Sequence, residues 1–273
     1  SRGIAPISHT RDTAGPMALA MADVELLDRV ISGAPAAKPA NLKAVRLGLA
    51  KPFLANLDAD TQADFDAALA KLKAAGVTLV EVDMPQLMET NGGVSFPVAL
   101  YEANDDMVKY LKHTGTRLTI AQLAEQAASP DVKGTYQGLV IPRKLPGPNN
   151  TLVDAKPAYD AAMKTGRLAL KRIYAAAFKQ HRLDALVFPT VPKVAMVANA
   201  ESSSVPTFMG VIQNTDPGSN AGLPGLQIPI ALGATSKLPV GLELDGPAGS
   251  DRRLVAIGLA LEPVFGRLVA PAK

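Results

Sequence analysis

The sequence predicts an α/β protein in which helices cover the faces of a β-sheet. Three consecutive stretches carry this prediction: an apolar run at 45–49, a helical pattern over 58–75 and a second apolar run at 77–82. A strand, a helix and a strand in this order form a βαβ-type unit, whose helix packs against the sheet. With 273 residues, of which 48% are hydrophobic and 19% charged, the chain has ample material for a large core.

The first part of the chain supplies helices to this sheet. Gly33 and Gly76 directly follow two of the helical patterns, where a glycine commonly ends a helix. The Pro, Gly and Asn residues of 141–153 predict a long loop outside the core. Helical patterns are found in four segments of this part, namely 18–31, 58–75, 96–112 and 119–127.

The second part of the chain predicts the rest of the sheet. A helical pattern over 155–181 leads into a strand at 184–188, which ends in Pro189-Thr190-Val191-Pro192. Open α/β sheets bind ligands at the carboxyl ends of their strands, so this exit is a candidate pocket wall, although a rigid strand end explains it as well. Segment 194–207 is expected to be irregular, and Asp251 is expected to cap the last helix. The closing elements are strands at 226–230 and 239–244 and a helix over 250–262.

Composition argues against several classes of protein. The net charge is +3 and the basic residues are dispersed, whereas nucleic-acid binding normally needs a concentrated basic stripe. The chain has no cysteine, which excludes disulfides, cysteine nucleophiles and cysteine-based zinc sites. His9, His113 and His181 are too far apart in sequence for a metal-ligand motif, and no Gly-rich phosphate loop occurs. We therefore expect neither a metal nor a cofactor.

The sequence also gives no sign of a membrane segment. No apolar run approaches the roughly 18 residues that a membrane-spanning helix needs, and no signal peptide opens the chain. We expect a cytoplasmic protein that contacts neither membrane nor nucleic acid.

No residue pattern in the chain supplies a self-sufficient nucleophile. Ser8, His9 and Asp12 invite comparison with a catalytic triad, but triad members come from separate elements, and adjacent Ser8 and His9 would struggle to align. A Ser-x-x-Lys pair is absent as well. From the residues alone, we assign no catalytic residue.

One segment has the composition of a binding site. Residues 214–225 place polar side chains and three glycines just before an apolar strand. Such a loop lets backbone approach a ligand closely and offers amide and carboxylate partners. An ordinary set of turns leading into the strand accounts for the same composition, and both interpretations stay open.

Several motifs, taken together and in this order, identify a family. Asp12-x-x-Gly15-Pro16-Met17-Ala18, the strand end at 184–192, and the segments 220–229 and 238–242 resemble the amidase signature family, which hydrolyses carboxamides with a Ser, cis-Ser, Lys triad. The amino-acid sequences of 7–13 and 214–224 resemble those of the branch that contains mandelamide and indoleacetamide hydrolases. This resemblance implies a small primary amide substrate with an aryl or arylalkyl acyl group.

The resemblance refines the expected fold. It implies an α/β/α sandwich around a mixed β-sheet, of which residues 1–273 are the C-terminal portion of a single domain that lacks its N-terminal half. The base Lys, the cis-Ser and the nucleophile Ser of the triad are expected to precede Ser1. The isolated chain is then expected to be inactive and to supply scaffold and pocket wall. Its exposed core face is expected to be covered by an N-terminal fragment or by a homo-oligomer.

The resemblance also suggests which residues contact substrate. Thr10 and Asp12 are expected near the nucleophile loop, although Asp12 is slightly better explained as a turn or helix cap beside Gly15 and Pro16. The residues expected near the leaving group or acyl group are Asn214, Asp216 and Asn220.

Few aromatic residues are available for an aryl pocket. Phe208 and Tyr101 are the candidates. Two other residues depart from the family's pattern, since Leu19 stands where Arg is usual and Glu243 where Gln is common. Either change could alter local hydrogen bonding without changing the reaction.

Two alternatives belong to other classes of protein. One is a non-catalytic scaffold or binding subunit that keeps the amidase pocket without the chemistry. The other is an unrelated α/β solute-binding protein, which the ordered C-terminal motifs argue against. A Gly/Ser-rich segment with Ser and Lys upstream in the gene would favour the enzyme over the scaffold.

Overall fold

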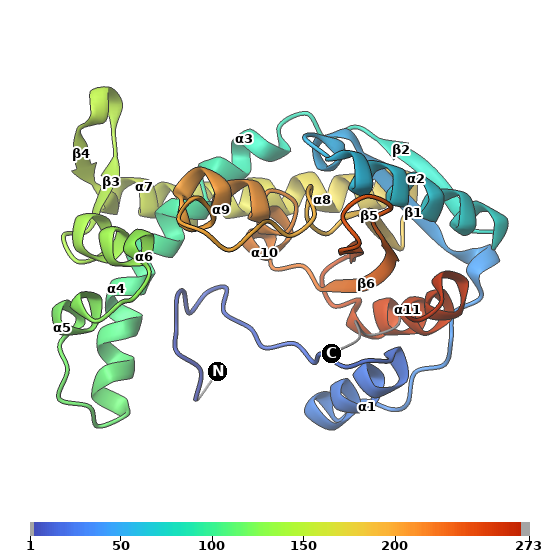
Figure 1. Cartoon of the computed structure of the whole chain (residues 1–273), viewed down its shortest axis with the longest axis horizontal. Coiled ribbons are helices and arrows are strands. Elements are labelled where there is room, and N and C mark those ends of the chain that lie inside the picture. Colours follow the sequence, from blue (N-terminus) through green and yellow to red (C-terminus); the bar gives the residue numbers. More distant parts are fainter. Residues whose placement is uncertain (1–2, 269–273) are drawn as a thin grey trace. The chain divides into compact units, whose positions relative to one another are not determined.

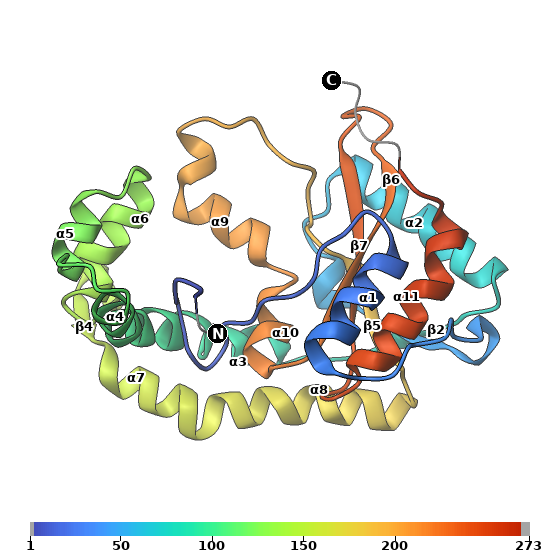
Figure 2. The same ribbon diagram turned by 90° about the horizontal axis from the view of Figure 1, so that it is seen from below.

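The computed structural model of the chain describes residues 3–268, which divide into two compact units. The sheet unit comprises 15–87, 172–196 and 210–268, and the helical unit comprises 3–14, 88–171 and 197–209. Each unit is described by itself (Figures 1 and 2). The single domain expected over 1–273 stays a prediction.

The sheet unit is built on a five-stranded mixed sheet in the order β2-β1-β5-β7-β6. β1 pairs in parallel with β2 and β5, whereas β7 is antiparallel to both β5 and β6. A bulge between Pro229 and Ala231 suits an edge strand, because proline cannot donate to the ladder. The strands are β1 (Arg46–Ala50), β2 (Thr78–Val82), β5 (Ala185–Pro189), β6 (Gly225–Leu232) and β7 (Pro239–Asp245).

Helices α2 and α11 cover one face of this sheet, and α1 packs against α11, as Figure 2 shows. Leu242 and Leu244 of β7 pack in the same buried cluster as Phe65 of α2 and Ile257 of α11. Arg252 of α11 also forms ion pairs with two acidic residues of α1. The helices are α1 (Met21–Ser32), α2 (Ala59–Ala74) and α11 (Asp251–Phe265).

The alternate residues of β7 point to the opposite face, because successive side chains of a strand leave on opposite sides. These are Gly241, Glu243 and Asp245, and the two acidic residues are buried. Helix α10 (Asp216–Ala221) packs on this face, since Gly218 lies against the Asp245 carboxyl. The sheet therefore has one apolar face and one face with buried acids.

The helical unit is arranged around α4, which contributes to its buried apolar clusters. A short antiparallel hairpin, β3 with β4, precedes α7, and α7 continues through a π-helical turn into α8. The chain passes between the two units at three places in these helices: at the start of α3, within α8 and within α9. The elements are α3 (Leu87–Gly92), α4 (Ser95–His113), α5 (Ile120–Glu125), α6 (Pro130–Thr135), a π-turn (Tyr136–Val140), β3 (Lys144–Pro146), β4 (Leu152–Asp154), α7 (Ala155–Ala161), a π-turn (Ala162–Gly166), α8 (Arg167–His181) and α9 (Val205–Ile212).

These elements confirm the predicted α/β class and most of the predicted segments. Three details were wrong. The expected loop at 141–153 contains β3 and most of β4, and 214–225 contains α10, which begins with Pro217 in its first turn and ends at Gly222 with φ +70°. Asp251 does not cap α11, because Ser250 occupies the N-cap position and no side chain caps that end. Among the described residues, no helix is both long and apolar enough to cross a membrane.

Candidate functional site

Residues 7–12, which include the predicted site residues Thr10 and Asp12, form a tight turn in the helical unit. The Asp12 Oδ2 atom accepts hydrogen bonds from the backbone N–H groups of Ile7 (2.9 Å) and Ser8 (3.0 Å). The backbone N–H groups of Arg11 and Asp12 both donate to the Ser8 carbonyl. Asp12 therefore caps the turn, which is the role that its sequence position favoured, and its contact with substrate stays a prediction.

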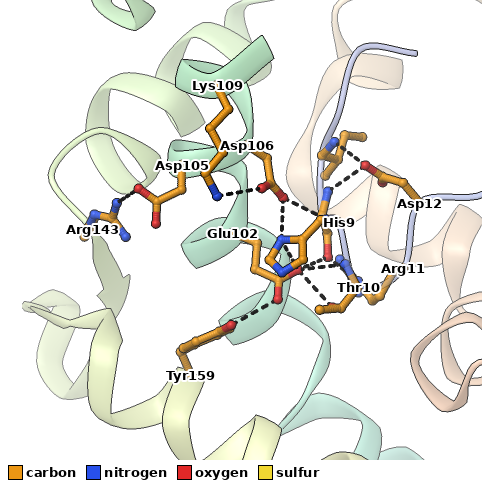
Figure 3. A network of polar contacts seen from close by, with 12 residues as sticks. His9, Thr10, Arg11, Asp12, Glu102, Asp105, Asp106, Lys109, Arg143 and Tyr159 are labelled. Carbon is orange, nitrogen blue, oxygen red and sulfur yellow. Dashed lines mark hydrogen bonds and ion pairs between the residues drawn. The ribbon is translucent and has the colours of Figure 1, made fainter. Parts of the chain in front are cut away.

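Glu102 on α4 binds this turn through its buried carboxyl group, as Figure 3 shows. Its Oε2 atom accepts from the hydroxyls of Ser8 (2.5 Å) and Thr10 (2.9 Å) and from the Thr10 backbone N–H (3.3 Å). Its Oε1 atom accepts from the Tyr159 hydroxyl (3.1 Å). The predicted site residue Thr10 is thus fixed by a carboxylate some ninety positions away in the sequence.

Asp106 repeats this arrangement one helical turn further along α4. Its Oδ2 atom accepts from the His9 backbone N–H (2.7 Å) and lies 2.8 Å from His9 Nδ1. The His9 ring itself is 56% exposed, whereas Asp106 is buried. Charge-assisted bonds of this kind are stronger than neutral ones, so the two carboxylates fix the turn as a unit.

Aromatic and charged groups pack on the far side of Glu102. Burial and, after it, the nearby Glu102 carboxylate together raise the pKa of Tyr159 to about 12. The Tyr159 ring stacks on Tyr101 at 4.3 Å, and the Arg143 guanidinium lies 4.7 Å above the Tyr101 ring. Tyr101, one of the two aryl-pocket candidates, is therefore part of this stack, while Phe208 is 49% exposed.

His9, Glu102 and Asp106 offer ligand atoms within 4.8 Å of one another, so we tested whether they fit a metal ion. Glu102 Oε2, which lies 3.6 Å from His9 Nδ1, has two lone pairs and already accepts from three donors of Ser8 and Thr10, while Oε1 accepts from Tyr159. A metal ion would have to displace these donors. The cluster is better explained as the hydrogen-bonded anchor of the turn.

Replacement of Tyr159 by Phe tests this anchor mildly. The substitution removes one neutral donor from Glu102 but leaves its three others and the ring stack in place. We expect the free energy of unfolding to fall by about 1 kcal/mol, as urea titration would measure. Tyr136→Phe is the matched control, and an equal loss there would contradict the role given to the Tyr159 hydroxyl.

The predicted residues of the second group lie in the sheet unit, where Asn214 has a structural role. Its side chain is fully buried, and Nδ2 donates to the backbone carbonyls of Pro189 (2.7 Å) and Phe53 (3.0 Å). Asn214 thereby joins the end of β5 to the chain entering α10. A contact between Asn214 and substrate stays a prediction.

Asp216 and Asn220 belong to α10 itself. Asp216 is its first residue, and Asn220 is fully buried. The structure therefore brings Asn214, Asp216 and Asn220 together on one segment, and Thr10 and Asp12 on another, each within its own unit. Their contact with substrate stays a prediction.

The structure adds two buried acids that the site prediction did not include, Glu243 and Asp245 of β7. Burial raises the pKa of Glu243 to about 7, and the Thr190 hydroxyl beside it opposes this slightly. Burial and then the charge of Glu243 raise the pKa of Asp245 well above its usual range. Two patterns in the sequence could have indicated these buried acids. Glu243 and Asp245 alternate with apolar residues along a predicted strand, and Glu102 and Asp106 are four residues apart within a helical pattern.

Comparison with known proteins identifies the family. The family model described as Amidase matches residues 1–255. The chain belongs to the amidase family. It is 37% identical over 271 residues to mandelamide hydrolase of Pseudomonas putida, with 99% of this chain and 54% of that protein covered. It is 41% identical over 271 residues to indoleacetamide hydrolase of Rhizobium radiobacter, with 96% and 56% covered.

Solved amidase structures share the fold. A structure described as that of an amidase matches with a TM-score of 0.74 and 25% identity over 96% of this chain and 55% of that chain. The peptide amidase PAM, solved with the competitive inhibitor chymostatin, matches with a TM-score of 0.67 and 25% identity over 96% and 55%. The chain thus spans about half the length of the relatives it matches.

Proposed function

We propose that the complete protein to which this chain belongs hydrolyses small primary amides with an aryl or arylalkyl acyl group. The observation that carries the proposal is the 37–41% identity to mandelamide and indoleacetamide hydrolases across almost the whole chain. Both names describe enzymes that cleave a carboxamide next to an arylalkyl group. The cytoplasm is the proposed location.

The proposed chemistry is acyl transfer through a serine. A lysine, acting through a cis-serine, would take the proton of the nucleophilic serine, whose oxygen attacks the amide carbon. Backbone N–H groups would stabilise the oxyanion, ammonia would leave with a proton, and water would release the carboxylic acid from the acyl-enzyme. We assign the three triad residues to a part of the amidase outside this sequence.

In this proposal the chain contributes scaffold and pocket wall. The anchored turn with Thr10 and Asp12, and the segment with Asn214, Asp216 and Asn220, are the proposed substrate-facing elements. Their fixed geometry supports the role, because catalytic sites need preorganised walls. Without the triad, a loss on the order of 10⁶ in rate is expected, so the isolated chain should show no turnover.

We also propose that a protein surface covers α1, either the remaining portion of the amidase or a second copy of the chain. Large apolar side chains are exposed on and just before this helix, which monomeric proteins rarely allow over a contiguous area. They are Met17 (91% exposed), Leu19 (94%), Val30 (73%) and Ile31 (71%).

A substrate panel tests the proposed activity. The complete protein is expected to release ammonia from phenylacetamide and mandelamide at least tenfold faster, as kcat/KM, than from acetamide, because aryl burial strengthens binding. An exposed-site variant, Glu201→Ala, should leave the rates unchanged. Equal rates for all three amides would overturn the acyl preference, and no release from any amide would favour a non-catalytic scaffold.

A further inference from the structure

The buried face of β7 carries two carboxyl groups that the proposed chemistry does not use. Glu243 and Asp245 are two residues apart, so both side chains leave the strand on the same side. Glu243 is 9% exposed and Asp245 is 5% exposed. Within the described residues, neither forms an ion pair with a lysine or arginine.

The carboxyl groups of Glu243 and Asp245 both lie against Gly225 of β6. Gly225 pairs with Asp245 across the ladder. A Cβ atom at Gly225 would lie 2.8 Å from Glu243 Oε1 and 3.2 Å from Asp245 Oδ1, so both carboxyl oxygens occupy the volume that a side chain would fill. On the other side of β7, the paired residues are Leu186 and Phe188, which provide no charge.

Each of the two acids contacts one of the polar segments described above. Asp245 Oδ2 lies so close to Gly218 of α10 that a Cβ atom there would overlap it. The Glu243 carboxyl faces the hydroxyl of Thr190, directly after β5, and this hydroxyl makes no hydrogen bond of ordinary geometry within the described residues. A single strand therefore contacts both the exit of β5 and the segment 214–224.

The other titratable groups near the pair are acidic. The buried Tyr174 hydroxyl of α8 has no hydrogen-bond partner in the described structure. Burial raises its pKa, and Asp245 and Asp216 raise it in the same direction. Gln227 and Thr190, which both lie against Gly241 on the same face of β7, are neutral. An ionised carboxylate in this environment is disfavoured, since no cation offsets its desolvation.

We propose that Glu243 and Asp245 form a protonated acid pair that positions the Thr190 exit and the 214–224 segment, and that ionisation of Glu243 loosens both. The proposal rests on the proposed function only for the role of these segments as pocket walls. Glu243 and Asp245 act as positioning residues, because neither is assigned a contact with substrate.

The direction of the pH effect follows from the raised pKa. The pKa of Glu243 is about 7 in the folded protein and 4.5 in its ordinary environment. Between these values the folded state keeps a proton that the unfolded state releases, so the stabilisation is complete below pH 4.5 and is lost as the pH rises through 7. The equilibrium constant for opening should rise about 300-fold across this window, which is ten to the power of the pKa difference.

Hydrogen exchange with mass spectrometry on the 273-residue chain tests the proposal without any substrate. After correction for the intrinsic exchange rate, amides of 214–224 should open about 10- to 70-fold more readily at pH 8 than at pH 5, because the opened state is already largely ionised at pH 5. Glu243→Gln keeps the shape and removes the Glu243 ionisation, so the rise in exchange through pH 7 should be lost and any remaining pH dependence should come from Asp245. Asp245→Asn should leave the Glu243 transition near pH 7, because a protonated Asp245 places no charge beside Glu243.

Three results would overturn the proposal. They are a flat exchange profile in the wild-type chain, an unchanged slope in Glu243→Gln, and a Glu243 carboxyl ¹³C resonance that titrates near pH 4.5. The ¹³C measurement needs no variant, so it decides the question even if a substituted chain fails to fold. Absence of amide hydrolysis would overturn the proposed function and leave this result untouched.

Discussion

Glu102→Ala is expected to lower the free energy of unfolding of the helical unit by about 3–5 kcal/mol. The substitution leaves the buried Ser8 hydroxyl and the Thr10 and Tyr159 donors without their acceptor. Each buried donor that loses its partner costs about 1–3 kcal/mol, and the cavity adds to this. Urea unfolding followed by circular dichroism measures the loss.

Glu201→Ala is the matched control, because it removes an exposed glutamate of the same unit. Its effect should be within about 0.5 kcal/mol. Hydrogen exchange adds a local measurement, since the amides of 7–12 should lose protection in Glu102→Ala before those of α4 do. A Glu102→Ala chain as stable as the control would show that Glu102 does not hold the turn.

Asn214→Ala is expected to lower the free energy of unfolding of the sheet unit by about 2–4 kcal/mol, as urea titration would measure. The buried carbonyls of Phe53 and Pro189 would both lose the donor that Asn214 provides. Asn214→Asp should cost more at pH 7, because a buried carboxylate would face two carbonyl oxygens. Part of this extra loss should be recovered at pH 4, where the substituted side chain is protonated and can donate one bond.

Gln213→Ala is the control for this pair of variants. Gln213 is adjacent in sequence, and its bonds to Asn56 and to the Ala55 carbonyl are exposed. It also donates to Asn214 Oδ1 at 3.3 Å, so Gln213→Ala removes a contact with the Asn214 oxygen but keeps both bonds of the Asn214 amide nitrogen. Gln213→Ala should lower the free energy of unfolding by less than about 1 kcal/mol. If Asn214→Asp were as stable as Asn214→Ala at pH 7, the amide of Asn214 would not be the donor that joins β5 to α10.

The sequence predicted the regular parts of this fold because their signals are local. The helical period of 58–75 and the apolar runs on either side of it gave α2, β1 and β2 almost to the residue. The hairpin β3 with β4 was missed because each strand has only three residues and Pro146 and Gly147 are typical of loops. Helix α10 was missed for a similar reason, since Asp-Pro-Gly-Ser-Asn has the composition of a turn.

The site was less predictable, because its contacts join distant parts of the chain. Thr10 and Asp12 were singled out from a family motif, yet the carboxylate that fixes Thr10 is residue 102. The four-residue spacing of Glu102 and Asp106 places both on one face of a helix, but it does not show that this face is buried, since a glutamate on a helix is usually solvated. Glu243 was noted only as a departure from a common Gln, and its raised pKa depends on burial in the folded sheet unit, which no local pattern shows.

We propose that this chain forms part of the wall of an amidase pocket and that the nucleophilic serine lies outside this sequence. Intact mass spectrometry before and after a serine-directed fluorophosphonate tests it, with ammonia release from phenylacetamide measured in parallel. For the 273-residue chain of 28.4 kDa, we expect no adduct and no ammonia, while the complete protein should take up one adduct and release ammonia. One adduct on the 273-residue chain, together with turnover, would contradict the account.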